Sequence, residues 1–566
     1  MKKILFALTV AIAALFLTGC EKRLDIQKKG VISLEDFYQT DADAESALVN
    51  VYYQAARWLS NTMGTEAGWN ECPLLNPFEY ASDDMFAAGS DKADGVEGNQ
   101  INAFWYDNTN SVITGSYHCY YMIIAACNQL LDPFAEAADT QVKKRCVAEA
   151  RVMRAYMHLV LAMGWKNPPL IDHVLDGGDR PENVESQEYL LSWIASECDK
   201  AIPDLTERAS TADKDGAVKI TKGFAYAIKG KALLFKGDKA GAAAALKQVI
   251  DSGKYALVPG EEMSSLYHYS GRGNSESVFE FNLKYDATVD GYYQRAQPNF
   301  KMLWGWRGDK MNLPKGKGTE ITGDNTWGWC NPSKKFVDAI LAEDGYDSFR
   351  RKAWIKSFDE VLYEMPYTSD GDNFVPGKTD AKEADPDRGI IAADGLYGHV
   401  GWFMWKRLYR MEDKTPSGEI QWNLVVMRYS EVLLMYAEAA QDASYIKMVQ
   451  QRAGVPEDKW VTTYSDNALR NEKFIECWLE GSRFPDLVRW GIAAQELADN
   501  GKYLPNFCDA MYSKAESKHR GYIDDHDANW CVGAHPDMGF KADKHSYFPI
   551  PFAEKNVNPN IKSWNE

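Results

Sequence analysis

The stretch TKGFAYAIKGKALLFKGDKAGAAAALKQVIDSG, residues 221–253, predicts two helices joined by a tight turn. Its first half carries apolar residues at steps of three or four, a spacing that places them on one face of a helix: Phe224, Ile228, Ala232 and Phe235. A Gly-Asp turn follows. The second half repeats the pattern, ends at Gly253, and has as its apolar face Ala242, Ala245, Leu246, Val249 and Ile250.

Two helices of this size joined by Gly237-Asp238 resemble a tetratricopeptide hairpin. The same periodicity predicts a helix over 150–163, followed by the breaker pair Pro168-Pro169. Further helices are expected over 42–58, 111–131, 187–202, 426–441 and 469–478. The repeats share little identity. The predicted fold class is therefore mainly α, built from degenerate tetratricopeptide-type helical hairpins.

A loop-rich part of the chain interrupts this pattern. Residues 260–423 are rich in Gly, Asp, Pro and Trp, with one clear helical stretch near 333–342, and residues 498–547 are similarly irregular. Long connections of this kind are usually functional or disordered, and their aromatic content argues against disorder. We expect these elaborations to pack on a helical scaffold at 40–259 and 424–497, within one unit spanning 20–566.

The N-terminus predicts export and lipidation. A cationic start at Lys2 and Lys3 precedes a short apolar run and then Leu17-Thr18-Gly19-Cys20. This order is typical of a secretory signal peptide, here residues 1–19, and the run is short for a membrane-spanning helix. Leu-Thr-Gly-Cys resembles the bacterial lipobox, which implies that Cys20 carries the lipid. We therefore expect a protein anchored to a membrane by lipid on Cys20.

The net charge limits the classes of binding partner, and the cysteine count limits the possible disulfides. The formal net charge of −18 makes the surface repel nucleic acid and anionic headgroups. Nine cysteines follow Cys20, none of them in a C-x-x-C pair, and an odd number cannot all pair internally. Cys119 and Cys127 lie in apolar helical sequence, where a free thiol behaves as a small hydrophobe.

Several longer motifs occur in a fixed order. They are EARVMRAY at 149–156, ESVFE at 276–280, RYSEVLLMYAEAA at 428–440, QRAG at 451–454, EGSRFPDLVRWG at 480–491, FPIP at 548–551 and NPN at 558–560. The late cluster has Glu480, Arg483, Asp486 and Arg489 at steps of three, so these side chains can pair along one helical edge. We expect structural ion pairs here, because such pairs are commoner than catalytic ones.

Together these motifs resemble the SusD/RagB family of outer-membrane nutrient-binding lipoproteins along nearly the whole chain. The resemblance implies a SusC-like TonB-dependent barrel as partner, over which the protein closes as a lid. It also implies that the ligand is usually an oligosaccharide, with peptides handled by some members.

No enzyme chemistry is predicted. The chain has no H-E-x-x-H, G-x-S-x-G or G-x-x-x-x-G-K-[ST] sequence. The late histidines have spacings that match no zinc pattern: His519, His526, His535 and His545. Adjacent Asp83-Asp84 is better explained by a helix cap or turn than by glycoside hydrolysis. We therefore expect neither catalytic residues nor a metal or other cofactor.

Tryptophan supplies the candidate binding surface. Eight of the 18 tryptophans lie between residues 304 and 422, and two pairs stand at i,i+2, Trp304/Trp306 and Trp327/Trp329. In extended chain, i and i+2 point to the same side, so each pair could offer two rings to a sugar. Core filling is the alternative.

A second candidate segment follows Ser82-Asp83, where the family resemblance implies aromatic and polar ligand groups. This chain offers Asp91, Asn99 and Gln100 there, with no tryptophan until Trp105.

The resemblance implies a lipoprotein anchored in the outer membrane and facing the cell surface, and the predicted function is capture of a glycan nutrient there and its delivery to the barrel. A peptide or another small nutrient is the alternative ligand, and a non-transport scaffold or an enzyme is the second alternative. The motifs are common to the first two interpretations.

Overall fold

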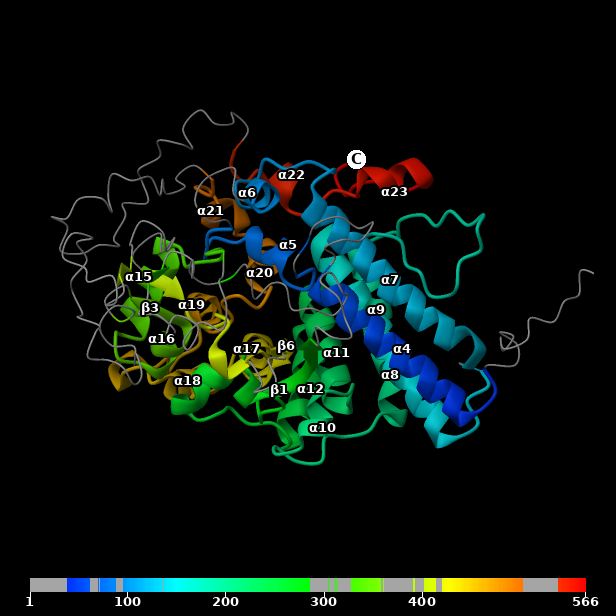
Figure 1. Cartoon of the computed structure of the whole chain (residues 1–566), viewed down its shortest axis with the longest axis horizontal. Helices are drawn as coiled ribbons and strands as arrows, with labels where there is room; N and C mark the ends of the chain where they lie inside the picture. The colour runs from blue at the N-terminus through cyan, green and yellow to red at the C-terminus, as the bar shows by residue number, and fades with distance from the viewer. Residues whose placement is uncertain are drawn as a thin grey trace, which may run out of the picture.

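The computed structural model describes residues 38–61, 70, 72–87, 95–134, 136–285, 304, 311–312, 327–357, 360, 390–391, 402–413, 420–501 and 538–566. The ends of the described chain, Tyr38 and Glu566, both lie on the same half of the molecule as helices α4 and α7 (Figure 1). Cys20 and the predicted signal peptide lie outside the described residues.

A row of antiparallel helices forms the scaffold (Figure 1). Neighbours in contact are α4 with α7 and α8, α7 with α8, α8 with α9, α9 with α11, α11 with α12, and α12 with α17. The long members are α4 (Asp41–Ser60), α7 (Ser111–Phe134), α8 (Gln141–Trp165), α9 (Gln187–Ala201), α11 (Lys222–Lys236), α12 (Lys239–Asp251), α17 (Tyr429–Ala440) and α18 (Ala443–Ala453). The prediction of a mainly α fold is confirmed.

The hairpin at 221–253 forms as predicted. Gly237 ends α11 in the left-handed region at φ +88°, a conformation that glycine adopts without steric cost. Asp238 then caps α12, its carboxylate accepting a hydrogen bond from the Gly241 amide at 2.8 Å. The two helices approach closely at Gly230, where a Cβ atom would lie 2.5 Å from Leu246 Cγ.

Side-chain caps fix the starts of α4 and α9 within one residue of the predicted positions, whereas α8 begins at Gln141, nine residues before the helix predicted at 150–163. Thr40 forms a capping box with Asp43 at the start of α4, Thr140 caps α8, and Ser186 caps α9. The predicted helix at 426–441 begins later, at Tyr429. Residues up to Arg428 belong instead to strand β6 (Ile420–Arg428), which pairs antiparallel with β1 (Ser277–Tyr285). An apolar run continuing from strand into helix hides this boundary.

The remaining described elements are short. The predicted helix at 333–342 is α15 (Lys334–Glu343), and the sequence did not predict α16 (Phe349–Trp354) or the two-stranded pairs β2–β4 and β3–β5. These strands are β2 (Met311–Asn312), β3 (Ile355–Ser357), β4 (Ile390–Ile391) and β5 (Trp402–Met404). The other short helices are α5 (Asn76–Tyr80), α6 (Val96–Asn102), α10 (Lys214–Ala217), α19 (Asp466–Glu476), α20 (Arg483–Arg489), α21 (Ala493–Glu496), α22 (Ala542–His545) and α23 (Phe552–Val557).

The cysteines of the described residues are packing residues. All seven are buried: Cys72, Cys119, Cys127, Cys146, Cys198, Cys330 and Cys477. Burial raises the pKa of Cys127 to about 12, so its thiol stays protonated. Cys508 and Cys531 lie outside the described residues. Within the described chain, the helices are all too short or too polar to cross a membrane.

Candidate functional site

Two segments that the sequence singled out separately lie against each other. Residues 82–87 run beside residues 327–333, where the Phe86 amide donates to the Asn331 carbonyl at 3.0 Å and the Cys330 amide donates to the Phe86 carbonyl at 3.0 Å. The Ser333 amide and hydroxyl extend the contact to the carbonyls of Asp84 and Asp83. Hydrogen bonds therefore join residues 82–87 to residues 327–333, and we call this contact the junction.

Gly95 extends the junction on the side that leads into α6. It adopts φ +75°, and a Cβ atom at this position would lie 2.9 Å from the ring of Trp329. Only glycine permits both this backbone conformation and this close approach to the ring. Gly95, at the start of α6, therefore lies directly against the ring of Trp329.

The tryptophan pair does not form a shared flat platform, contrary to the expectation. The rings of Trp327 and Trp329 lie 5.8 Å apart at 65°, edge to face. The chain between and after them is not extended, because Gly328 has φ +83° and Cys330 has φ +60°. The i,i+2 rule for extended chain consequently does not hold. Left-handed backbone at a non-glycine residue carries strain of the kind found at ligand sites.

Burial divides the predicted tryptophans by role. Trp304 is 0% exposed and Trp329 is 6% exposed, so both rings fill the core, while Trp327 is half-buried at its edge. Trp304 and Trp329 also form an isolated parallel bridge that brings 304 to the junction. Trp304 and Trp329 therefore fit the alternative of core filling, because both rings are buried. Trp306 lies outside the described residues.

The polar candidates after Ser82 are largely engaged. Asn99 is 5% exposed within α6, and the side chain of Gln100 accepts a hydrogen bond from Asn110 Nδ2 at 2.9 Å. Asp91 lies outside the described residues. The ligand-binding assignments of these three residues and of the tryptophans remain predictions.

Buried charges hold the base of the junction. Burial raises the pKa of Asp83, but Arg483, at 2.8 and 2.9 Å, and Lys335 outweigh it and lower this pKa to about 2. Burial and the adjacent Asp83 charge raise the pKa of Asp84 to about 7, although the Ser82 hydroxyl donates to its carboxylate. Asp83 is thus committed to ion pairs, and neither carboxylate is placed for glycoside hydrolysis. The Asp83–Arg483 contact links positions 400 residues apart, so a single sequence gave no signal for it.

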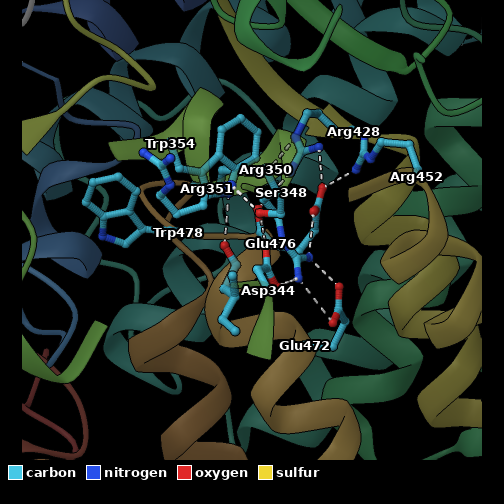
Figure 2. Close-up of polar contacts among 12 residues, drawn as sticks. Asp344, Ser348, Arg350, Arg351, Trp354, Arg428, Arg452, Glu472, Glu476 and Trp478 are labelled. Carbon is cyan, nitrogen blue, oxygen red and sulfur yellow. Dashed lines mark hydrogen bonds and ion pairs between the residues drawn. The ribbon is translucent and has the colours of Figure 1, made fainter. Parts of the chain in front are cut away.

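A larger cluster of buried charges involves side chains from α16 and α19 (Figure 2). Arg350 bonds Asp344, Glu472 and Glu476, while Arg428 and Arg452 converge on Glu476. Lys406 and Arg428 also hold Glu480 at 2.6 Å. These side chains are at most 9% exposed. The cluster ties α16 and residues 402–413 to α19, and its groups are saturated by one another rather than directed at a ligand.

The pKa shifts in this cluster follow from burial and pairing. Burial raises the pKa of Glu476, but Arg452, Arg428 and Arg350 outweigh it and leave this pKa well below its usual range. Burial raises the pKa of Glu472 to about 7 and lowers the pKa of Lys406 to about 8.

The ion pairs predicted for the 480–491 motif are structural, but they do not run along one helical edge. Asp486 and Arg489 pair at 2.7 Å within α20 as expected. Glu480 precedes the helix and pairs with Lys406 and Arg428, while Arg483 reaches Asp83 and Glu496. The motif therefore joins distant segments.

Metal-binding chemistry has little to build on in the described part of the chain. No group of three or more His, Cys, Asp or Glu side chains there is arranged to hold a metal ion. Burial lowers the pKa of His545 to about 4, and its Nδ1 accepts a hydrogen bond from the Lys541 amide at 2.9 Å. His519, His526 and His535 lie outside the described residues.

The scaffold and the junction place this protein in the class of proteins built on helical hairpins, with non-helical segments packed on them. The sequence profile of the SusD family matches residues 275–566, and the chain belongs to this family.

Known relatives resemble the chain over nearly its full length. The SusD-like protein P2 of Formosa agariphila is 24% identical over 90% of this chain and 94% of its own. A solved laminarin-binding SusD-like protein is similar with a TM-score of 0.67 and 24% identity, covering 93% of this chain and 99% of its own. Surface glycan-binding protein A from Bacteroides thetaiotaomicron, solved with laminarihexaose, has a TM-score of 0.65 and 20% identity over 93% and 100%. These likenesses establish the fold.

Proposed function

We propose that this protein captures an oligosaccharide at the cell surface and passes it to a SusC-like TonB-dependent transporter. The observation that carries the proposal is the junction of 82–87 with 327–333, where a half-buried tryptophan lies at the edge of a rigid, hydrogen-bonded structure. Solved relatives that are named for laminarin or glycan binding support a carbohydrate as the ligand.

Trp327 is the proposed stacking residue. An aromatic ring suits the apolar face of a neutral sugar and needs no charge, which fits an acidic protein. Trp329 and Trp304 support it from below, because their rings are buried against the core. Trp306, Asp91, Asn99 and Gln100 complete the proposed binding surface.

The protein acts without catalysis in this proposal. The paired Asp83 and the saturated cluster around Glu476 hold the structure and leave no carboxylate pair free for hydrolysis among the residues just described. Lipidation at Cys20 would keep the protein at the outer membrane, because several acyl chains on one cysteine anchor stably.

A glycan array tests the ligand class. Soluble protein that starts after Cys20 should bind a narrow set of oligosaccharides, and mass spectrometry of these ligands after prolonged incubation should find them intact. Binding to peptides with no glycan bound would contradict the proposal, as would cleavage of a bound glycan.

A further inference from the structure

The connection between α8 and α9 is a protruding loop (Figure 1). It carries apolar side chains that are exposed to solvent. Residues 172–180 are all exposed, and within them Val174 is 47% and Leu175 is 40% exposed. We call residues 172–182 the acidic loop. It contains four acidic residues and one arginine, a net charge of −3 with His173 neutral. Adjacent exposed aliphatic residues on a protruding loop are unusual unless they meet a partner.

Hydrogen bonds to α7 hold the first half of the acidic loop in place. Asn128 on α7 donates to the His173 carbonyl at 2.8 Å, and the carboxylate of Asp132 accepts a hydrogen bond from the Val174 amide at 2.8 Å. The Asp176 amide donates to the Asp179 carboxylate at 2.6 Å, which closes the tip. Val174 and Leu175 are therefore held in place while their side chains stay in water.

Hydrogen bonds from three asparagines hold the second half of the loop and the residues that follow it. Asn558 donates to the Pro181 carbonyl at 2.7 Å and Asn560 to the Arg180 carbonyl at 3.3 Å. Asn183 exchanges hydrogen bonds with the backbone of Lys562 at 3.0 and 2.8 Å. A loop ordered in advance loses little conformational entropy on binding, so this construction favours recognition.

The loop is close to the point where the described chain begins. The ring of Tyr38 packs on Phe134 at the end of α7, at a centroid distance of 5.7 Å, two residues from Asp132. Seventeen residues lie between Cys20 and Tyr38, a connection that spans at most about 65 Å when fully extended. With Cys20 lipidated as proposed above, the acidic loop lies within reach of the membrane side.

We propose that the acidic loop docks on the outer-membrane barrel that receives the ligand, with Val174 and Leu175 entering an apolar recess rimmed by Lys or Arg. This inference rests on the proposed function. The charge of the loop selects a basic protein surface and opposes an anionic lipid surface. The exposed face of α7 adjoins the loop and extends the contact, through Met122, Ala125, Gln129 and Asp132.

Two residues do not make a whole interface, since stable interfaces bury about 800 Å² on each partner. They can still act as anchors, because a few residues carry most of the binding energy. Asp176 contributes at the rim, where its charge acts on the rate of association and its dependence on salt.

The test uses the full-length lipidated protein in native membranes. After mild-detergent extraction and pull-down, mass spectrometry quantifies the TonB-dependent barrel that co-purifies. The double variant Val174→Ser/Leu175→Ser should recover about tenfold less barrel, and Asp176→Lys should also reduce recovery, most strongly at low salt. The matched control is Val557→Ser, which alters a valine that is 65% exposed on α23 and should recover the barrel normally.

Glycan binding by the same variants separates the possible failures. If the wild type recovers the barrel and the loop variants recover it equally well, the docking site is overturned while the proposed function stands. If the wild type recovers no barrel, both the partner and the docking site fail, and retained glycan binding leaves the ligand class intact. Loop-dependent binding of Cys20→Ser protein to vesicles of phosphatidylglycerol and phosphatidylethanolamine would overturn the docking site in favour of a membrane contact.

Discussion

At the scale of single residues, burial assigns different roles to chemically identical side chains. Trp327 and Trp329 are two positions apart, yet one lies half-buried at the rim of the junction and the other lies beneath Gly95. The sequence singled out this pair, but it could not predict which of the two rings would be buried. The reason is the left-handed backbone at Gly328 and Cys330, which no period-two pattern reveals.

Trp327→Ala should abolish glycan binding and cost about 1–2 kcal/mol of stability, since its ring is only partly buried. Trp329→Ala should cost about 3–5 kcal/mol, as removal of a core tryptophan does. Chemical denaturation and calorimetric titration of both variants check this. Equal and large losses of stability would show that both rings only fill the core.

His158 should make the fold sensitive to mild acid. Its Nδ1 bonds the Arg154 carbonyl at 2.9 Å and its Nε2 accepts from the Ile171 amide at 3.2 Å, so both nitrogens are satisfied in the neutral ring. Burial, together with the Arg154 charge, lowers the pKa of His158 to about 4. From pH 6.5 down to about 4 the unfolded chain binds a proton that the native state does not, so stability falls by about 3 kcal/mol.

His158→Gln should remove that part of the fall, because the amide can donate and accept without taking a proton. The control is His173→Gln, since the His173 side chain is 60% exposed. Urea unfolding between pH 7 and 4 measures the difference. An unchanged pH slope in His158→Gln would refute the assignment.

At the scale of elements, helices with strong periodicity and clear caps were predictable, and long-range contacts were not. The α11–α12 hairpin follows from spacing, Gly237 and Asp238, all of which are local signals. The helix predicted at 426–441 wrongly includes the end of strand β6, residues 426–428, because the pairing of β6 with β1 depends on residues about 140 positions away. The contact between 82–87 and 327–333 is likewise a tertiary one. The sequence pointed to both segments but could not predict that they pack against each other.

The pair Asp83–Arg483 should be a critical tie between these elements. Arg483→Met leaves Asp83 buried with Lys335 as its cationic partner among the described residues, and we expect a loss of about 3 kcal/mol. Asp83→Asn/Arg483→Met should recover part of that loss, because it removes the buried charge as well. A double-mutant cycle by urea unfolding measures the coupling, and strictly additive effects would argue against a tie.

At the scale of the whole molecule, the proposed function requires a scaffold that is anchored to the membrane and a face that binds the ligand. Cys20→Ser should release the protein from the membrane fraction without altering its melting temperature, since the change precedes the described fold. Carbonate extraction followed by immunoblotting distinguishes the two forms. Retention of the variant as an integral component would contradict lipidation at this residue.

The central claim is that a glycan binds at the junction through Trp327. Isothermal titration of the best glycan from the array, with wild type and Trp327→Ala side by side, tests it most directly. We expect a dissociation constant between about 1 µM and 1 mM for the wild type, which is weak enough for release of the glycan to the transporter. We expect no measurable binding by the variant. Unchanged affinity in a folded Trp327→Ala protein would contradict it.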